Sequence, residues 1–236
     1  MTPRDRLIFA LDVESTSRAL SLVDTLHEHV GIFKIGLELF MRAALAGDDL
    51  VRRVARDHRV FLDLKLHDIP ETMLRALRAA RTEGGVEFLT IHTGDGPGPL
   101  EACSEEAEGI KLLGVTVLTS VGPEDLEDLG YAVDMVDLVS RRARWAIRGG
   151  CAGVVCSGRE AARVRAVLGE GPLIVTPGIR PAWDGVTVHD QKRVVTPADA
   201  VCAGADHIVV GRPIRDAKDP AEAARRIVEE MAGVLD

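Results

Sequence analysis

Three charged residues, Asp63, Lys65 and Asp68, interrupt the apolar run of residues 61–70. In an extended strand the side chains alternate between two faces, so Asp63 and Lys65 share the face opposite the leucines. Buried charge without a partner is costly, and both groups therefore need ionic partners. Their pairing suits electrostatic or proton-transfer catalysis, and the alternative interpretation is a structural ion pair at a strand end.

Two earlier runs carry charge in the same alternating way. Asp12 follows the apolar run of the first segment, and Lys34 stands between two apolar neighbours in the second. In a barrel of alternating strands and helices, the active site lies at the C-terminal ends of the strands. In such a barrel these two groups would meet Asp63, Lys65 and Asp68 at one rim.

The elements that must position these groups alternate between short apolar runs and longer segments with helical spacing. We predict strands at 7–13, 32–39, 60–66, 88–93, 112–119, 153–157, 173–178 and 207–212. We predict helices at 16–29, 41–57, 70–83, 97–108, 123–148, 159–168, 197–204 and 220–233. This alternation predicts a closed (β/α)8 TIM barrel, and a chain of 236 residues suits a single domain over residues 1–236.

The composition narrows the function classes. With a net charge of −8 and a pI near 5.4, the chain lacks the basic surface that nucleic acid or an anionic membrane requires. No apolar run approaches the ~20 residues of a membrane span. Residues 1–6 lead directly into a short strand rather than a signal-peptide core, and we therefore expect a cytoplasmic protein.

The cysteines give no sign of a metal site or a disulfide framework. Cys103, Cys151, Cys156 and Cys202 are scattered and form no Cys-x-x-Cys pair. We expect them to be small buried apolar side chains.

Other polar groups follow the later strands. Thr119 ends the fifth predicted strand, where its hydroxyl suits a hydrogen bond to a polar ring or a simple turn. Arg180 follows the seventh strand, and Gly211 and Arg212 end the eighth, where barrels of this kind often bind phosphate. Glycine lets the backbone approach an anion and arginine can bind it through two hydrogen bonds. We predict a phosphate site there.

The stretch 180–196 is longer than a usual strand-to-helix loop, which predicts a functional lid. Trp183 within it either covers a ligand or anchors the loop. His67 and His92 lie near strand ends but are not spaced as metal ligands and have no serine or cysteine to activate. We expect both histidines to be structural.

Short sequence blocks along the whole chain carry a resemblance. They are Ala10-Leu11-Asp12, Phe33 to Phe40, Asp63 to Pro70, Leu118-Thr119-Ser120, Gly153 to Ser157, Thr176 to Arg180, Asp190-Gln191-x-Arg193-Val194 with Thr196-Pro197, and Val209 to Pro213. Together they resemble the orotidine 5′-phosphate decarboxylase family. The Asp-x-Lys-x-x-Asp core is shared with a wider superfamily, whereas the other blocks are similar to the bacterial form of this family.

The resemblance implies decarboxylation of orotidine 5′-phosphate to UMP and CO₂, the last step of UMP synthesis, with no cofactor and no metal. It implies that Lys65 is the proton donor, surrounded by Lys34, Asp63 and Asp68. The implied substrate-binding residues are Asp12 and Lys34 at the ribose, Thr119 at the pyrimidine, and Arg180, Gln191, Gly211 and Arg212 at the phosphate. A homodimer is also implied, in which Asp68 and Thr72 reach the partner subunit's site.

The chain departs from the family pattern at a few places. Glu71 stands where many relatives have Asn, the turn after the fourth strand reads His92-Thr93-Gly94-Asp95-Gly96, and the loop from Arg180 to Gln191 is long. Two other functions stay open at this point. One is a Mg²⁺-dependent sugar-phosphate decarboxylase, for which Glu38 is the candidate metal ligand, and the other is a phosphate-sensing barrel without catalytic activity.

Overall fold

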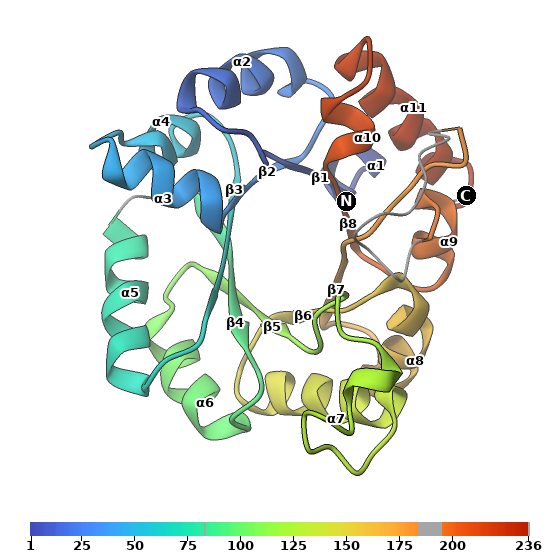
Figure 1. Ribbon diagram of the computed structural model, residues 1–236. Coiled ribbons are helices and arrows are strands. Elements are labelled where there is room, and N and C mark those ends of the chain that lie inside the picture. Colours follow the sequence, from blue (N-terminus) through green and yellow to red (C-terminus); the bar gives the residue numbers. More distant parts are fainter. Residues whose placement is uncertain (83, 184–194, 236) are drawn as a thin grey trace.

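In the computed structural model, which describes residues 1–82, 84–183 and 195–235, eight parallel strands close into a barrel. They follow one another in chain order around the barrel, which Figure 1 shows along its axis. The strands are β1 (Leu7–Ala10), β2 (Ile32–Gly36), β3 (Val60–Leu66), β4 (Val86–His92), β5 (Lys111–Val115), β6 (Gly153–Val155), β7 (Leu173–Thr176) and β8 (His207–Val210). The predicted (β/α)8 TIM barrel is confirmed.

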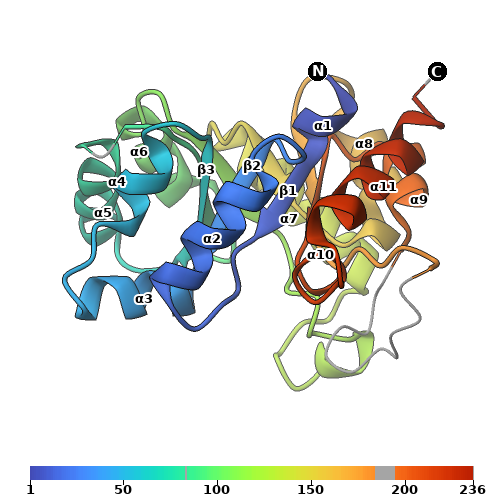
Figure 2. The same cartoon turned by 90° about the horizontal axis from the view of Figure 1, so that it is seen from above.

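Helices surround the barrel on its outer side (Figure 1). They are α1 (Pro3–Arg6), α2 (Thr16–Leu26), α3 (Leu37–Leu45), α4 (Leu50–Ala55), α5 (Pro70–Thr82), α6 (Pro97–Glu106), α7 (Met135–Arg148), α8 (Gly158–Leu168), α9 (Pro197–Cys202), α10 (Arg212–Arg215) and α11 (Pro220–Ala232), with a 3-10 turn η1 (Pro123–Asp125). Several begin at a side chain that accepts a backbone N–H, including Ser15, Asp134 and Asp219. Figure 2 shows both termini at one end of the barrel and the β5–α7 loop projecting from the other.

Some predicted boundaries were wrong, mainly at the C-terminal ends of strands. The segment 32–39 leaves the sheet after Gly36, because α3 begins at Leu37. The predicted helix 41–57 is divided by Gly47, whose φ is +68°. The predicted helix 123–148 is only the turn η1 and then α7, with Gly130 at φ +76° between them. Strand β5 ends at Val115, so Thr119 lies in a loop instead of a strand.

The core has two layers that follow the alternation of side chains along each strand. The outward-facing side chains pack against the helices, and the inward-facing ones fill the barrel: Ile8, Ala10, Ile32, Phe61, Phe88, Leu113, Val175 and Val209. The rings of Phe61 and Phe88 meet edge to face at 5.9 Å, which makes a closed apolar floor beneath the barrel mouth.

Two smaller predictions are also tested by the structure. Cys103, Cys151 and Cys156 are buried as expected, but Cys202 at the end of α9 is exposed, so the prediction is wrong for that cysteine. Within the ranges that the structure describes, every helix is too short or too polar to cross a bilayer.

Candidate active site

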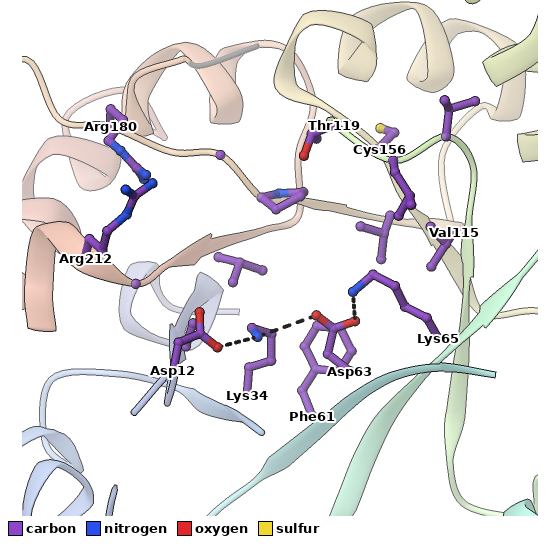
Figure 3. A pocket seen from close by; sticks show the side chains of 18 residues that line it. Asp12, Lys34, Phe61, Asp63, Lys65, Val115, Thr119, Cys156, Arg180 and Arg212 are labelled. Carbon is purple, nitrogen blue, oxygen red and sulfur yellow. Dashed lines mark hydrogen bonds and ion pairs between the residues drawn. The ribbon is translucent and has the colours of Figure 1, made fainter. Parts of the chain in front are cut away.

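A cavity of about 250 Å³ opens above the apolar floor, at the C-terminal ends of the strands (Figure 3). Its walls come from most of the barrel: Ala10, Asp12, Lys34, Phe61, Asp63, Lys65, Val115, Val117, Leu118, Thr119, Val155, Cys156, Pro177, Gly178, Arg180, Val209, Gly211 and Arg212. The structure therefore brings together in one place most of the side chains that the sequence singled out.

Four of these side chains form a continuous row of alternating charge. Lys34 Nζ lies 3.1 Å from Asp12 Oδ1 and 3.5 Å from Asp63 Oδ2, and Lys65 Nζ lies 2.7 Å from Asp63 Oδ1. The Lys34 side chain is only 9% exposed, whereas that of Lys65 is 36% exposed. Lys34 is thus enclosed between two carboxylates, and Lys65, at one end of the row, is the more accessible of the two ammonium groups (Figure 3).

The carboxyl group of Asp63 is held ionised by its neighbours. Burial acts to raise the pKa of Asp63, but the charges of Lys34 and Lys65 and hydrogen bonds from Lys65 and Thr90 outweigh it, so that this pKa lies below its usual value. A charged carboxylate is consequently fixed against Lys65 at the cavity floor.

The backbone at Lys65 is unusual. Its φ of +51° makes it the sole non-glycine residue with a positive φ in the part of the chain that the structure describes. The pairing of β3 with β4 also shifts register between Leu62 and Leu66, as in a β-bulge. Such conformations are costly for a residue with a Cβ atom, and they cluster at functional sites.

Two arginines stand at the other end of the cavity from Lys65 (Figure 3). Arg180 follows β7 and Arg212 follows β8, so both face the cavity from neighbouring strand ends. Gly211, next to Arg212, faces the end of β1: a Cβ atom there would lie 3.5 Å from Ala10 Cβ and 3.6 Å from Asp12 Oδ2, which are ordinary van der Waals distances. This end of the cavity can bind an anion, and the Lys65 end offers a cation to a developing negative charge.

Comparisons with known proteins identify the family of this chain. The model of the Orotidine 5′-phosphate decarboxylase / HUMPS family matches residues 5–227. The chain belongs to this family. It is 44% identical to an orotidine 5′-phosphate decarboxylase of Desulfosudis oleivorans, over 99% of this chain and 95% of that protein. It is 48% identical to one of Afipia carboxidovorans, over 98% and 96% respectively.

A solved structure supports the same relationship. The crystal structure of orotidine 5′-phosphate decarboxylase from Lactobacillus acidophilus superposes with a TM-score of 0.83 and 32% identity, covering 95% of this chain and 98% of that one. The resemblance found in the sequence is therefore confirmed, and the protein is an enzyme of the orotidine 5′-phosphate decarboxylase family.

Two residues that the family resemblance singled out, Asp68 and Thr72, do not line the cavity of their own chain. Asp68 lies in the exposed β3–α5 loop, where its Oδ1 accepts a 2.7 Å hydrogen bond from the Ile69 N–H, and Thr72 is exposed near the start of α5. Gln191 lies outside the described residues. The exposure of Asp68 and Thr72 therefore indicates a role other than lining the cavity of their own chain.

Two kinds of residue at this cavity were not predicted from the sequence. One is the apolar wall of Val115, Val155 and Val209, which the period-two alternation of the strands could have placed. The other consists of groups behind the wall, such as Arg215, whose Nη1 donates a 2.7 Å hydrogen bond to the Asp12 carbonyl. No spacing in the sequence links positions so far apart.

The remaining candidates have structural surroundings. His67 Nε2 lies 2.8 Å from Asp95 Oδ2, and the His67 and His92 rings are 5.2 Å apart, outside the residues that line the cavity. Arg226 on α11 lies 4.3 Å from the centre of the Trp183 ring. This cation–π contact supports the interpretation of Trp183 as a loop anchor.

Proposed function

We propose that this protein converts orotidine 5′-phosphate to UMP and CO₂ without a cofactor, and that Lys65 stabilises the reacting centre and then protonates it. The proposal takes its substrate from the names of the full-length relatives. Its mechanism is carried by one observation, the row Asp12–Lys34–Asp63–Lys65 along a single cavity.

The chemistry requires a fixed cation. When the bond between C6 of the pyrimidine and its carboxylate breaks, the electron pair stays on C6 and CO₂ leaves. No carbonyl is positioned to delocalise this carbanion, so the stabilisation must be electrostatic. The Lys65 ammonium group supplies the positive charge and then its proton to C6, and the resulting neutral amine regains a proton from water.

The rest of the row keeps Lys65 in place. Asp63 Oδ1 is 2.7 Å from Lys65 Nζ, and Lys34 on the other side of Asp63 prevents an excess of negative charge. A charge arrangement that is already formed before the substrate binds needs little reorganisation during the reaction. Asp12 and Lys34, midway along the cavity, would contact the ribose hydroxyls.

The opposite end of the cavity suits the phosphate. Arg180, Gly211 and Arg212 would bind it together with Gln191, and Thr119 in the β5–α7 loop would bind the pyrimidine. The phosphate lies far from the bond that breaks. Its binding energy would be used to hold the substrate against the charged row, so a substrate without phosphate should lose turnover as well as affinity.

The proposal includes a homodimer in which Asp68 and Thr72 complete the partner's site. Both residues are exposed, and apolar side chains follow the C-terminal ends of nearby strands at the same rim: Leu37 is 57% exposed and Ile69 is 67% exposed. Exposed apolar groups on one rim favour burial against another protein surface. Mixing inactive Lys65→Ala and Asp68→Ala proteins should restore activity, because one site of a mixed dimer would be intact.

The decisive assay uses the purified protein with orotidine 5′-phosphate in EDTA, followed by ultraviolet absorbance. Loss of the 6-carboxylate supports the proposal, and the absence of turnover would overturn it. Activity only with Mg²⁺ and a keto sugar phosphate would favour the related sugar-phosphate chemistry. That alternative has little support at Glu38, whose carboxylate is engaged 2.9 Å from Arg42 on the same helix. Phosphate binding without any turnover would indicate a sensing barrel.

A further inference from the structure

The positive φ of Lys65 raises the question of what holds its backbone. A φ of +51° is disfavoured for lysine and persists only where the surroundings determine it. The register shift between β3 and β4 leaves the Lys65 N–H without a place in the regular strand ladder. This N–H needs another acceptor.

Thr90 on β4 provides that acceptor. The Lys65 N–H donates a 2.9 Å hydrogen bond to Thr90 Oγ1, and the same hydroxyl donates a 3.0 Å hydrogen bond to Asp63 Oδ1. Asp63 Oδ1 also accepts the 2.7 Å hydrogen bond from Lys65 Nζ. One threonine hydroxyl therefore closes a ring of hydrogen bonds that contains both the main chain and the ammonium group of Lys65.

Thr90 lies behind the reacting groups. Its exposure is 0% and it does not line the cavity, although it shares a face of β4 with Phe88 and His92. It cannot touch a substrate in this arrangement. Any effect of Thr90 on the reaction must therefore pass through Lys65 and Asp63.

Two other buried threonines show what an ordinary strand-end hydroxyl does in this barrel. Thr93 Oγ1 donates 2.8 Å to the Val115 carbonyl, and Thr116 Oγ1 donates 3.0 Å to the Val155 carbonyl. Both are 0% exposed, like Thr90, but their hydroxyls donate to main-chain carbonyls. Thr90 differs because its hydroxyl links two charged residues of the site.

We infer that Thr90 is a positioning residue for the decarboxylation: it holds the left-handed backbone of Lys65 and the carboxylate of Asp63 so that Lys65 Nζ stands in the cavity. The inference rests on the proposed function of Lys65. Valine has nearly the shape of threonine but offers no hydroxyl. Thr90→Val leaves the buried Lys65 N–H without an acceptor and removes one hydrogen bond from Asp63, whereas Thr90→Ser retains the oxygen.

The test compares the kinetics of three variants with the wild type. Thr90→Val should lower kcat about 10- to 100-fold with KM changed less than about 3-fold, because the geometry of the reacting groups changes while the phosphate site does not. Thr90→Ser should recover most of the lost kcat. Thr93→Val is the matched control, a buried threonine three residues away, and should stay near wild-type activity. If Thr90→Val does not fold, Thr90→Ala takes its place.

A second measurement does not depend on turnover. The Lys65 amide hydrogen should exchange at least about 10-fold faster in Thr90→Val than in the wild type, and Thr90→Ser should restore its protection. Wild-type kcat together with unchanged Lys65 exchange in Thr90→Val would overturn the inference. A wild-type protein that does not act on orotidine 5′-phosphate would instead overturn the proposed function, and the exchange experiment would still decide whether Thr90 holds Lys65.

Discussion

The two mouths of the barrel both carry alternating charges, yet only one has the features of an active site. At the N-terminal mouth, Glu87 on β4 binds Arg59 and also accepts a 3.1 Å hydrogen bond from Lys111. At the C-terminal mouth, Asp63 is held between Lys34 and Lys65. In both places burial would raise the pKa of the carboxyl group and the neighbouring cations lower it below its usual value.

The two mouths differ in backbone conformation and in whether the charged side chains line a cavity. The charged side chains of the C-terminal mouth line a cavity that ends at two arginines. One of these charged residues, Lys65, has a left-handed backbone. At the N-terminal mouth, Glu87 pairs with both Arg59 and Lys111, and none of these three residues has a positive φ. A carboxylate with two cations on a strand face is therefore not enough to identify a site. What distinguishes the candidate active site is its position at the C-terminal ends of the strands, the strained backbone of Lys65 and the open cavity.

The largest difference between the two mouths should appear when one lysine is removed from each. Lys65→Ala should lower turnover by about 10³-fold or more, because it removes the stabilising cation and the proton donor together. Lys111→Ala should change turnover less than about 2-fold. UMP binding to Lys65→Ala, measured by calorimetry, should remain detectable. Substantial turnover by Lys65→Ala would remove this residue from its proposed role.

The far end of the cavity should affect binding first. Arg212→Ala should raise KM about 10- to 100-fold, because a charged hydrogen bond to phosphate is lost. Steady-state kinetics with orotidine 5′-phosphate would measure this change. Arg225→Ala is the control, since Arg225 is an exposed arginine that pairs with Glu222 on α11. An unchanged KM in Arg212→Ala would place the phosphate elsewhere.

At the N-terminal mouth, His207 should make stability depend on pH. Burial, reinforced by the charge of Arg59, lowers the pKa of His207 to about 4, and its ring packs against Phe88. In the unfolded chain His207 takes up a proton as the pH falls below about 6.5, whereas in the folded chain it stays neutral until about pH 4. The contribution of neutral His207 to the free energy of unfolding is therefore fully present above pH 6.5 and is lost as the pH falls towards 4. Between pH 7 and pH 5 we expect a loss of about 2 kcal/mol.

Urea unfolding at several pH values would test this expectation. The acid slope of the free energy of unfolding should be smaller in His207→Leu than in the wild type between pH 7 and pH 5, where most carboxyl groups stay ionised. Equal slopes in the two proteins would contradict the assignment to His207.

The smallest expected effect comes from the ion pair at the N-terminal mouth. Glu87→Gln should lower the free energy of unfolding by about 1 kcal/mol, because Arg59 and Lys111 are partly exposed and water screens their charges. Turnover should stay within about 2-fold of the wild type. Asp63→Asn, the matching change at the other mouth, should reduce turnover strongly. Comparable turnover losses in the two variants would remove the distinction between the mouths.

Much of the fold could be predicted from local pattern. Short apolar runs marked the eight strands, and period-two alternation in the third placed Asp63 and Lys65 on the same side as Phe61. Several of the errors fell where glycines end or interrupt an element, at Gly36, Gly47 and Gly130. Apolar periodicity continues across such positions in the sequence, but the backbone changes direction there.

The barrel, the charged rim and the family could all be predicted from the sequence, because they depend on residue type and on spacing within one element. How the charges are held depends instead on contacts between strands. The row from Asp12 to Lys65 joins three strands, and the Thr90 hydroxyl meets the Lys65 N–H across 25 positions of sequence. The left-handed backbone of Lys65 depends on that contact between neighbouring strands, which no local preference of lysine would predict.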